Sequence, residues 1–351
     1  MSNRRRRKTA RQSMSISLAP CARITCRSSP IRATSSRAEA ADMATAMRTT
    51  ISGVRSVELE LADPERAACF YTDVWHLTEV ARVGETIYLR GTAGFHHILA
   101  LRASHGPARV GRVVYEARTP AIVDALHARL AADGVTQLEV PGELDGVDGG
   151  YGFGLADPSG RRLAIVADAA RHPDDERRPD RPYKIAHVNF NDPAADRLTE
   201  FYVQCLGMKL VDRAGRQAFL NADSPDHSSI VICQAEANTL NHISFEMADL
   251  DSVMRGAGRM IDAGHPIEWG VGRHGCADNV FAYFAGPEEI PLEYTSDVLQ
   301  IDETYPYNGP EYWAWPAGRL DRWGVTPPHT KRWKRIQSLF AFRSGDYRLR
   351  G

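Results

Sequence analysis

The chain of 351 residues repeats itself, and this internal repeat constrains its fold more than any single motif. A strand-like run precedes a helical stretch that carries Phe70-Tyr71, and the same order returns with Phe201-Tyr202, 131 residues later. The same offset aligns the strand-like runs 95–101 and 226–232. The chain therefore contains two similar copies of one structural module.

Each copy divides once more into two related units. The four units lie near 51–105, 106–168, 182–235 and 236–296, and each reads as a strand, a helix and two or three further strands. Glycines after the expected helices 121–132 and 250–263 are typical of helix ends. We predict an α+β fold of two modules, each built from paired βαβββ units.

Segments of unusual composition flank the modules. Residues 1–38 hold nine Arg and one Lys with no acidic residue. Because the whole chain has a formal charge of −1, residues 39–351 have a formal charge of −11. We expect a disordered leader, which either a start codon assigned too far upstream or an organellar transit peptide would explain. The expected segments are a basic leader (1–50), an N-terminal module (51–170), a charged, proline-rich linker (171–182), a C-terminal module (183–298) and a Trp- and Pro-rich tail (299–351). We expect the tail to pack on the body or on a neighbouring subunit, because it carries four tryptophans.

Composition excludes several classes of protein. No run approaches eighteen apolar residues, so no membrane-spanning helix is expected. A body this acidic argues against nucleic-acid binding, which needs Lys and Arg on the folded domain. The six cysteines are scattered without a CxxC pair, which favours reduced thiols and a cytoplasmic location.

Three residues of the second copy have the composition of a metal site. They are His187, His242 and Glu293, each on an expected strand, and their counterparts in the first copy are Ser56, Arg112 and Ala164. Two imidazoles and one carboxylate suit a facial triad, which holds Fe(II) or Mn(II) and leaves positions open for substrate and dioxygen. A single histidine on a strand is more often a core residue, but an unpaired buried carboxylate is costly, so the three together favour a metal site.

The four units with this triad resemble the vicinal oxygen chelate superfamily and, within it, the two-module type I extradiol ring-cleaving dioxygenases, such as catechol 2,3-dioxygenase and dihydroxybiphenyl dioxygenase. The resemblance covers about 51–300 and is sharpest in 270–297, where His274 lies nine residues before Tyr283 and Tyr283 ten before Glu293. It implies that His187, His242 and Glu293 bind Fe(II), with Mn(II) the alternative, and that His274 and Tyr283 contact the substrate. The N-terminal module would be metal-free.

The resemblance also implies an activity. A small aromatic diol would be the substrate and O2 the co-substrate of an Fe(II)-dependent extradiol dioxygenase in aromatic-compound catabolism. A homo-oligomer is expected, as in most of the family.

One position departs from the family pattern. The family carries an acid–base histidine near residue 228, usually in a His-His-Ser run, whereas this chain reads Asp226-His227-Ser228-Ser229. If Ser228 occupies that place, general acid–base catalysis worth about 10²–10⁴-fold is lost. If the strand is shifted by one residue, His227 is the catalytic residue. We interpret His96-His97 of the first copy as structural remnants.

Two alternative functions stay open. A metal-dependent enzyme of the same fold with isomerase or lyase chemistry would account for Ser228, but its glyoxalase type generally completes four protein ligands. A non-catalytic small-molecule-binding protein of the bleomycin-resistance type would not need Glu293 beside two histidines.

Overall fold

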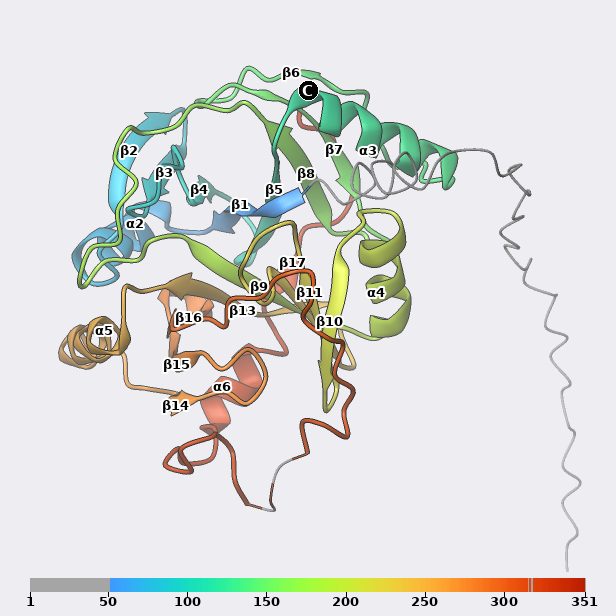
Figure 1. Ribbon diagram of the computed structural model, residues 1–351. Coiled ribbons are helices and arrows are strands. Elements are labelled where there is room, and N and C mark those ends of the chain that lie inside the picture. The colour runs from blue at the N-terminus through green and yellow to red at the C-terminus, as the bar shows by residue number, and fades with distance from the viewer. Residues whose placement is uncertain (1–50, 315, 317, 351) are drawn as a thin grey trace, which may run out of the picture. The chain divides into compact units, whose positions relative to one another are not determined.

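The computed structural model describes residues 51–314, 316 and 318–350. The leader expected at 1–50 and Trp315 of the tail lie outside the described residues. The first module contains two βαβββ units (Figure 1). The first unit comprises β1 (Ile51–Leu61), α2 (Pro64–Asp73), β2 (Thr78–Val83), β3 (Thr86–Arg90) and β4 (Leu99–Ala103). The second comprises β5 (Arg109–Ala117), α3 (Pro120–Ala132), β6 (Gly142–Glu143), β7 (Tyr151–Ala156) and β8 (Arg162–Ala167).

The second module repeats this order. Its first unit comprises β9 (Ile185–Asp192), α4 (Ala195–Gln204), β10 (Lys209–Ala214), β11 (Gln217–Asn221) and β12 (Ile230–Gln234). Its second unit comprises β13 (Thr239–Glu246), α5 (Leu250–Asp262), β14 (Trp269–Arg273), β15 (Val280–Ala285) and β16 (Pro291–Ser296), with the 3-10 helix η1 (Pro287–Glu289) before β16. The expectation of an α+β fold with paired βαβββ units is confirmed, and three strands follow each helix.

The strands of both modules pair in the same order and with the same mixture of parallel and antiparallel neighbours. In the first, the strands pair in the order β2-β3-β4-β1-β5-β8-β7-β6, with β1 parallel to β4, antiparallel to β5, and β5 parallel to β8. In the second, the order is β10-β11-β12-β9-β13-β16-β15-β14 with the same directions. The short β17 (Ala341–Phe342) pairs with β13 of one module and β5 of the other.

In each module, one helix begins at an aspartate that caps it. Asp63 accepts a hydrogen bond from the Arg66 amide at the start of α2, and Asp249 accepts one from the Ser252 amide at the start of α5. Their buried faces join one apolar core that extends through both modules. Trp75, which follows α2, stacks on Tyr294 of β16 with ring centroids 3.7 Å apart. Packing of this kind joins the first unit of the first module to the second unit of the second module.

The tail packs on both modules. Helix α6 (Lys331–Ile336) buries Trp333, which is 1% exposed, beside Tyr283 of β15. Near the C-terminus, the Arg112 guanidinium donates to the Arg348 carbonyl, and the Leu349 amide donates to Glu139. The tail therefore contributes to the interior of both halves. Within the described residues, none of the helices has the length and apolarity needed to span a membrane.

Candidate metal centre and active site

Strand register brings the three predicted metal ligands together. Ser244 of β13 lies opposite both His187 of β9 and Glu293 of β16. Directly opposed residues of neighbouring strands share a face, so His187 and Glu293 lie on one face of the sheet. His242 precedes Ser244 by two residues and projects from that same face. Neither helix supplies a ligand, so the sheet alone positions the set.

The first module has the same register with different residues. Val114 of β5 lies opposite Ser56 of β1 and Ala164 of β8. The counterparts inferred from the sequence are therefore the structural counterparts. Arg112 occupies the place of His242 and is bound to the tail carbonyl of Arg348. These residues cannot form a His-His-carboxylate set.

The donor atoms of the second module form a compact triangle. His187 Nε2 lies 3.0 Å from His242 Nε2, and Glu293 Oε2 lies 3.3 Å and 3.2 Å from these two nitrogens. Donors about 2.1 Å from one ion and at right angles to each other lie about 3.0 Å apart. The three side chains therefore match one face of a metal's coordination shell.

The protonation states suit a cation. Burial lowers the pKa of His242 to about 4, so its imidazole is neutral at neutral pH. Burial raises the pKa of Glu293, but the imidazoles of His187, His242 and His274 outweigh it and leave that pKa well below its usual value. Glu293 is 0% exposed, and neither of its carboxylate oxygens accepts a hydrogen bond from the described chain. A buried anion without a hydrogen-bond donor is costly, and a bound divalent metal would compensate its charge.

Hydrogen bonds behind His242 fix its tautomer. Asn241 Oδ1 accepts from His242 Nδ1 at 2.8 Å and from Gln337 Nε2 at 2.6 Å, while Asn241 Nδ2 donates to Asn191 at 2.9 Å. Because Nδ1 carries the hydrogen, the lone pair is on Nε2 and faces the other ligands. Sequence reasoning missed this network. Asn241 adjoins a predicted ligand and could have been found, but nothing in the sequence links Gln337 to it.

A cavity of about 350 Å³ opens beside the triad. His187 and His242 lie in its wall, together with the aromatic side chains of Phe219, Trp269 and Tyr283. The tail contributes Leu320, His329, Trp333 and Gln337 to the same wall. The predicted substrate-contacting residues, His274 and Tyr283, also line this cavity. His274 Nε2 lies 2.8 Å from the Tyr283 hydroxyl. Burial raises the pKa of Tyr283 well above its usual value, so its phenol keeps its proton.

The structure places Ser228, rather than His227, in the cavity wall. His227 is 0% exposed, and its Nε2 lies 2.6 Å from Asp212 of β10. His227 therefore does not reach the cavity directly, although the shifted register would require it to contact a substrate there. The strand expected from residue 226 begins only at Ile230, so His227 and Ser228 lie in the bent segment before β12, and their side chains take different directions there.

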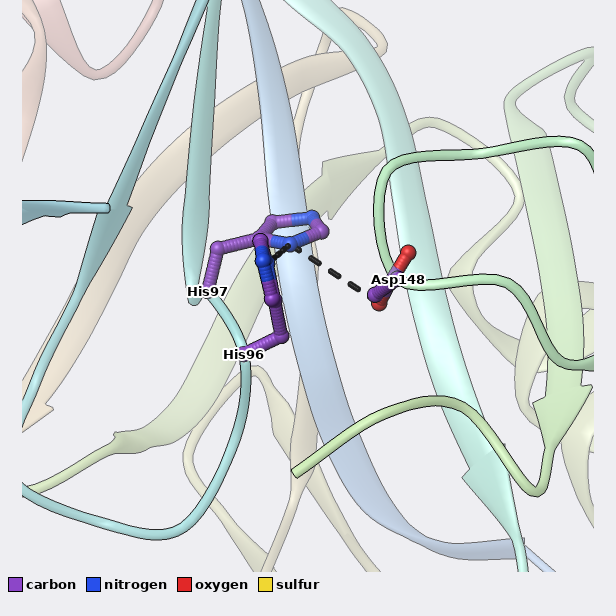
Figure 2. A group of neighbouring side chains, drawn as sticks. All are labelled: His96, His97 and Asp148. Atoms are coloured by element: carbon purple, nitrogen blue, oxygen red, sulfur yellow. Dashed lines mark hydrogen bonds and ion pairs between the residues drawn. The ribbon is translucent and has the colours of Figure 1, made fainter. Parts of the chain in front are cut away.

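A second cluster lies in the first module (Figure 2). His96 Nδ1 and His97 Nδ1 are 3.1 Å apart, and His97 Nδ1 lies 3.8 Å from Asp148. The buried guanidinium of Arg55 already binds Asp148 at 2.7 Å, so this carboxylate is charge-compensated by the chain itself. Burial lowers the pKa of His97 to about 4, which keeps it neutral. These contacts favour a structural role, and the interpretation as structural remnants stays a prediction.

Fold and site together define a class of protein: two tandem βαβββ modules, of which the second holds a buried His-His-Glu set beside a cavity. Residues 54–165 and 184–294 match the model of the Glyoxalase/Bleomycin resistance protein/Dioxygenase superfamily. The chain belongs to this superfamily, and the resemblance inferred from the sequence is confirmed.

Individual relatives agree with this assignment. The chain is 31% identical over 179 residues to metapyrocatechase 2 of Cupriavidus necator, a match that spans 49% of this chain and 51% of that protein. It is 25% identical over 299 residues to a manganese-dependent 2,3-dihydroxybiphenyl 1,2-dioxygenase of Geobacillus genomosp. 3, over 73% of this chain and 93% of that protein. The Mn(II)-bound glyoxalase from Novosphingobium aromaticivorans has a similar structure, with a TM-score of 0.76 and 28% identity over 81% of this chain and 94% of that one.

Proposed function

We propose that this protein is an extradiol ring-cleaving dioxygenase, which binds Fe(II) and uses O2 to cleave a catecholic ring in aromatic-compound catabolism. One observation carries the proposal: a buried, ionised carboxylate and two imidazole Nε2 atoms converge within 3.0–3.3 Å beside a cavity with aromatic walls. Two relatives support this proposal by their names, a metapyrocatechase and a dihydroxybiphenyl dioxygenase.

The metal would be held by His187, His242 and Glu293. A divalent ion with open positions supplies Lewis acidity and a template on which a diol and dioxygen meet. Imidazole and carboxylate ligands suit Fe(II) and Mn(II) equally by type. We favour Fe(II), with Mn(II) the alternative, and the manganese-dependent relative supports keeping both.

His274 and Tyr283 would act on the substrate. Their hydrogen bond of 2.8 Å orients both groups, and His274 Nε2 lies 3.7 Å from Glu293 Oε1. Either group can donate a hydrogen bond to an oxygen atom on which negative charge develops, provided that the site excludes water. Trp269 stacks on Tyr283 with ring centroids 5.2 Å apart and holds the phenol in place.

The cavity favours an uncharged aromatic diol. Its lining contains four large aromatic side chains, Phe219, Trp269, Tyr283 and Trp333, but neither a Lys nor an Arg from the described chain. Aromatic side chains bind an aromatic ring, whereas a carboxylate on the substrate would lose hydration without gaining a Lys or Arg partner. Catechol, alkylcatechols and dihydroxybiphenyl therefore fit better than acidic diols.

A second function, metal-dependent isomerase or lyase chemistry, is favoured by two observations. These are Ser228 in the cavity wall and the likeness to a Mn(II)-bound glyoxalase. Against it stands the ligand set, which has three protein ligands rather than the four that the glyoxalase type generally completes. A non-catalytic binding protein of the bleomycin-resistance type would retain affinity for ligands without any metal.

The discriminating experiment measures oxygen and metal together. Protein loaded with Fe(II) under argon is mixed with catechol, 3-methylcatechol and 2,3-dihydroxybiphenyl, and oxygen uptake and a yellow ring-cleavage product are followed. We expect both signals to be lost in His242→Ala and kept in His105→Ala, a control on the exposed surface. Metal binding without oxygen uptake from any diol would favour the isomerase or lyase, and absence of metal binding would favour the binding protein.

Charge and cysteine content bear on the partners and the location of the protein. We propose a homo-oligomer that acts in the cytoplasm and binds neither nucleic acid nor membrane. Free thiols at Cys69, Cys233 and Cys276 suit a reducing compartment. The net −11 of residues 39–351 argues against phosphate backbones as ligands. Sedimentation measurements on the purified protein test the oligomer.

A further inference from the structure

A line of hydrogen bonds leads from a buried carboxylate to the cavity wall. Asp212 Oδ2 lies 2.6 Å from His227 Nε2, and His227 Nδ1 lies 3.4 Å from Ser228 Oγ. Asp212 and His227 are both 0% exposed, whereas Ser228 lines the cavity. The three side chains thus connect the protein interior to the place where a substrate would bind.

Other donors fix the direction of this line. Asp212 also accepts hydrogen bonds from the Asn308 amide at 3.1 Å, from Asn308 Nδ2 at 2.9 Å and from the Tyr305 hydroxyl at 3.0 Å. The Cys276 thiol donates to it at 3.4 Å. Burial raises the pKa of Asp212, but hydrogen bonds from His227, Asn308 and Tyr305 outweigh burial and lower it. Asp212 is therefore a carboxylate that only accepts hydrogen bonds.

The tautomer of His227 follows from this. Since Asp212 accepts from Nε2, the Nε2 atom of His227 carries hydrogen, and a neutral ring then has its lone pair on Nδ1. Nδ1 accepts the hydrogen of the Ser228 hydroxyl. The lone pairs of Ser228 Oγ are then left to accept a hydrogen bond from a hydroxyl group in the cavity.

We propose that Ser228 and His227 form a proton relay for the diol substrate, with Asp212 as the positioning residue. Ser228 Oγ takes the proton of a substrate hydroxyl while its own proton passes to His227 Nδ1. The step yields a singly ionised diol, a neutral serine and an imidazolium beside the Asp212 carboxylate. The same protons move back when the product needs one, so no further reactant is required. The relay rests on the proposed function, because a diol must be the proton donor.

The surroundings favour the imidazolium. The titratable groups that face His227 are Asp212, Cys276 and Tyr305, and only the carboxylate carries charge when His227 accepts the proton. A buried cation hydrogen-bonded at 2.6 Å to a carboxylate is compensated, whereas an isolated one is not. The distance of 3.4 Å from Nδ1 to Oγ is long, and such bonds tighten when a substrate binds.

The test compares substrates that do and do not need a base. Catechol is neutral at pH 8, whereas 4-nitrocatechol has already lost its first proton there. In metal-loaded protein, we expect Ser228→Ala to lower kcat/KM for catechol by about 10²-fold, the lower end for general acid–base catalysis. We expect it to change kcat/KM for 4-nitrocatechol by less than about threefold, because that ligand has already lost the one proton that the relay removes. Ser228→Thr, which keeps the hydroxyl, should retain most activity on both.

A matched control and a binding readout separate the relay from simple structural damage. Ser229 is also buried but does not line the cavity, so Ser229→Ala should leave both substrates unaffected. Under argon, without turnover, the pH at which bound 4-nitrocatechol turns yellow should rise in Ser228→Ala relative to the unaltered protein. An equal loss on both substrates, or no loss and no change in that pH, would overturn the relay. Protein that ionises 4-nitrocatechol through Ser228 but cleaves no diol would refute the proposed function alone.

Discussion

Asn241 offers the sharpest test of the metal centre, because it acts on the metal only through His242. In Asn241→Ala the acceptor 2.8 Å from His242 Nδ1 is gone, and the imidazole is free to rotate and to adopt either tautomer. Loss of such a hydrogen bond to a metal ligand typically weakens metal binding by about 10–100-fold. This corresponds to about 1.4–2.7 kcal/mol of binding free energy.

The substitution also has a cost in stability that must be measured separately. Asn191 Oδ1, which is buried, loses its donor at a cost of about 1–3 kcal/mol, and the partly buried Gln337 Nε2 loses its acceptor. The assay therefore combines two measurements on metal-free protein. Calorimetric titration with Mn(II), which is stable in air, gives the dissociation constant, and urea unfolding gives the free energy of unfolding.

Two variants control for side effects. Gln337→Ala removes one donor to Asn241 but leaves its bond to His242, so we expect a smaller change in metal affinity. Asn238→Ala removes a hydrogen bond to the Ser159 carbonyl, outside the site, and should leave the affinity unchanged. If Asn241→Ala binds Mn(II) within twofold of the unaltered protein, the hydrogen bond does not orient the ligand and the reasoning is wrong.

Three further predictions follow from burial and charge. Trp333→Ala should lower the free energy of unfolding by about 3–5 kcal/mol, because this side chain is 1% exposed, whereas Trp323→Ala, 39% exposed, should change it little; urea unfolding measures both. The pKa of His97 is lowered to about 4 in the folded protein, so its imidazole is protonated in the unfolded chain at a higher pH than in the folded one. The free energy of unfolding therefore falls as the pH drops from about 6.5 to about 4. In metal-free His97→Gln, about 3 kcal/mol of that fall should disappear, and unchanged pH dependence would contradict it. Oxygen uptake should be far weaker with 3,4-dihydroxyphenylacetate than with 3-methylcatechol, and equal rates would show that the cavity accepts an anion.

Several features of the fold follow from local sequence patterns. The repeat of Phe70-Tyr71 and Phe201-Tyr202 reflects two copies of one helix that packs in the same way. The helices expected at 121–132 and 250–263 agree with α3 and α5 to within one residue at each end. Apolar periodicity and capping residues act over a few residues, so they can be read without tertiary contacts. The same holds for the three predicted ligands, because their residue types and their positions on expected strands together indicate a metal site.

Other features depend on contacts between distant segments. Gln337 lies 96 residues from Asn241 along the chain and meets it only because the tail folds over the second module. Asp212 and His227 lie on opposite sides of β11 in the sequence, and only strand pairing brings the carboxylate to the ring. No periodicity records such pairs, because they arise from packing and register rather than from local conformation.

The tandem βαβββ modules, the superfamily and the residue types of the His-His-Glu set follow from the amino-acid sequence without any knowledge of tertiary contacts. The placement of Ser228 at the cavity and of His227 behind it depends on the tertiary structure, because both residues precede β12 and His227 is held by Asp212 of β10, a distant partner. The tertiary structure also decided that the tail forms part of the cavity wall. Burial of Trp333 against Tyr283 stabilises that arrangement. The hydrophobic effect is non-directional, so the sequence does not indicate which residue an apolar side chain packs against.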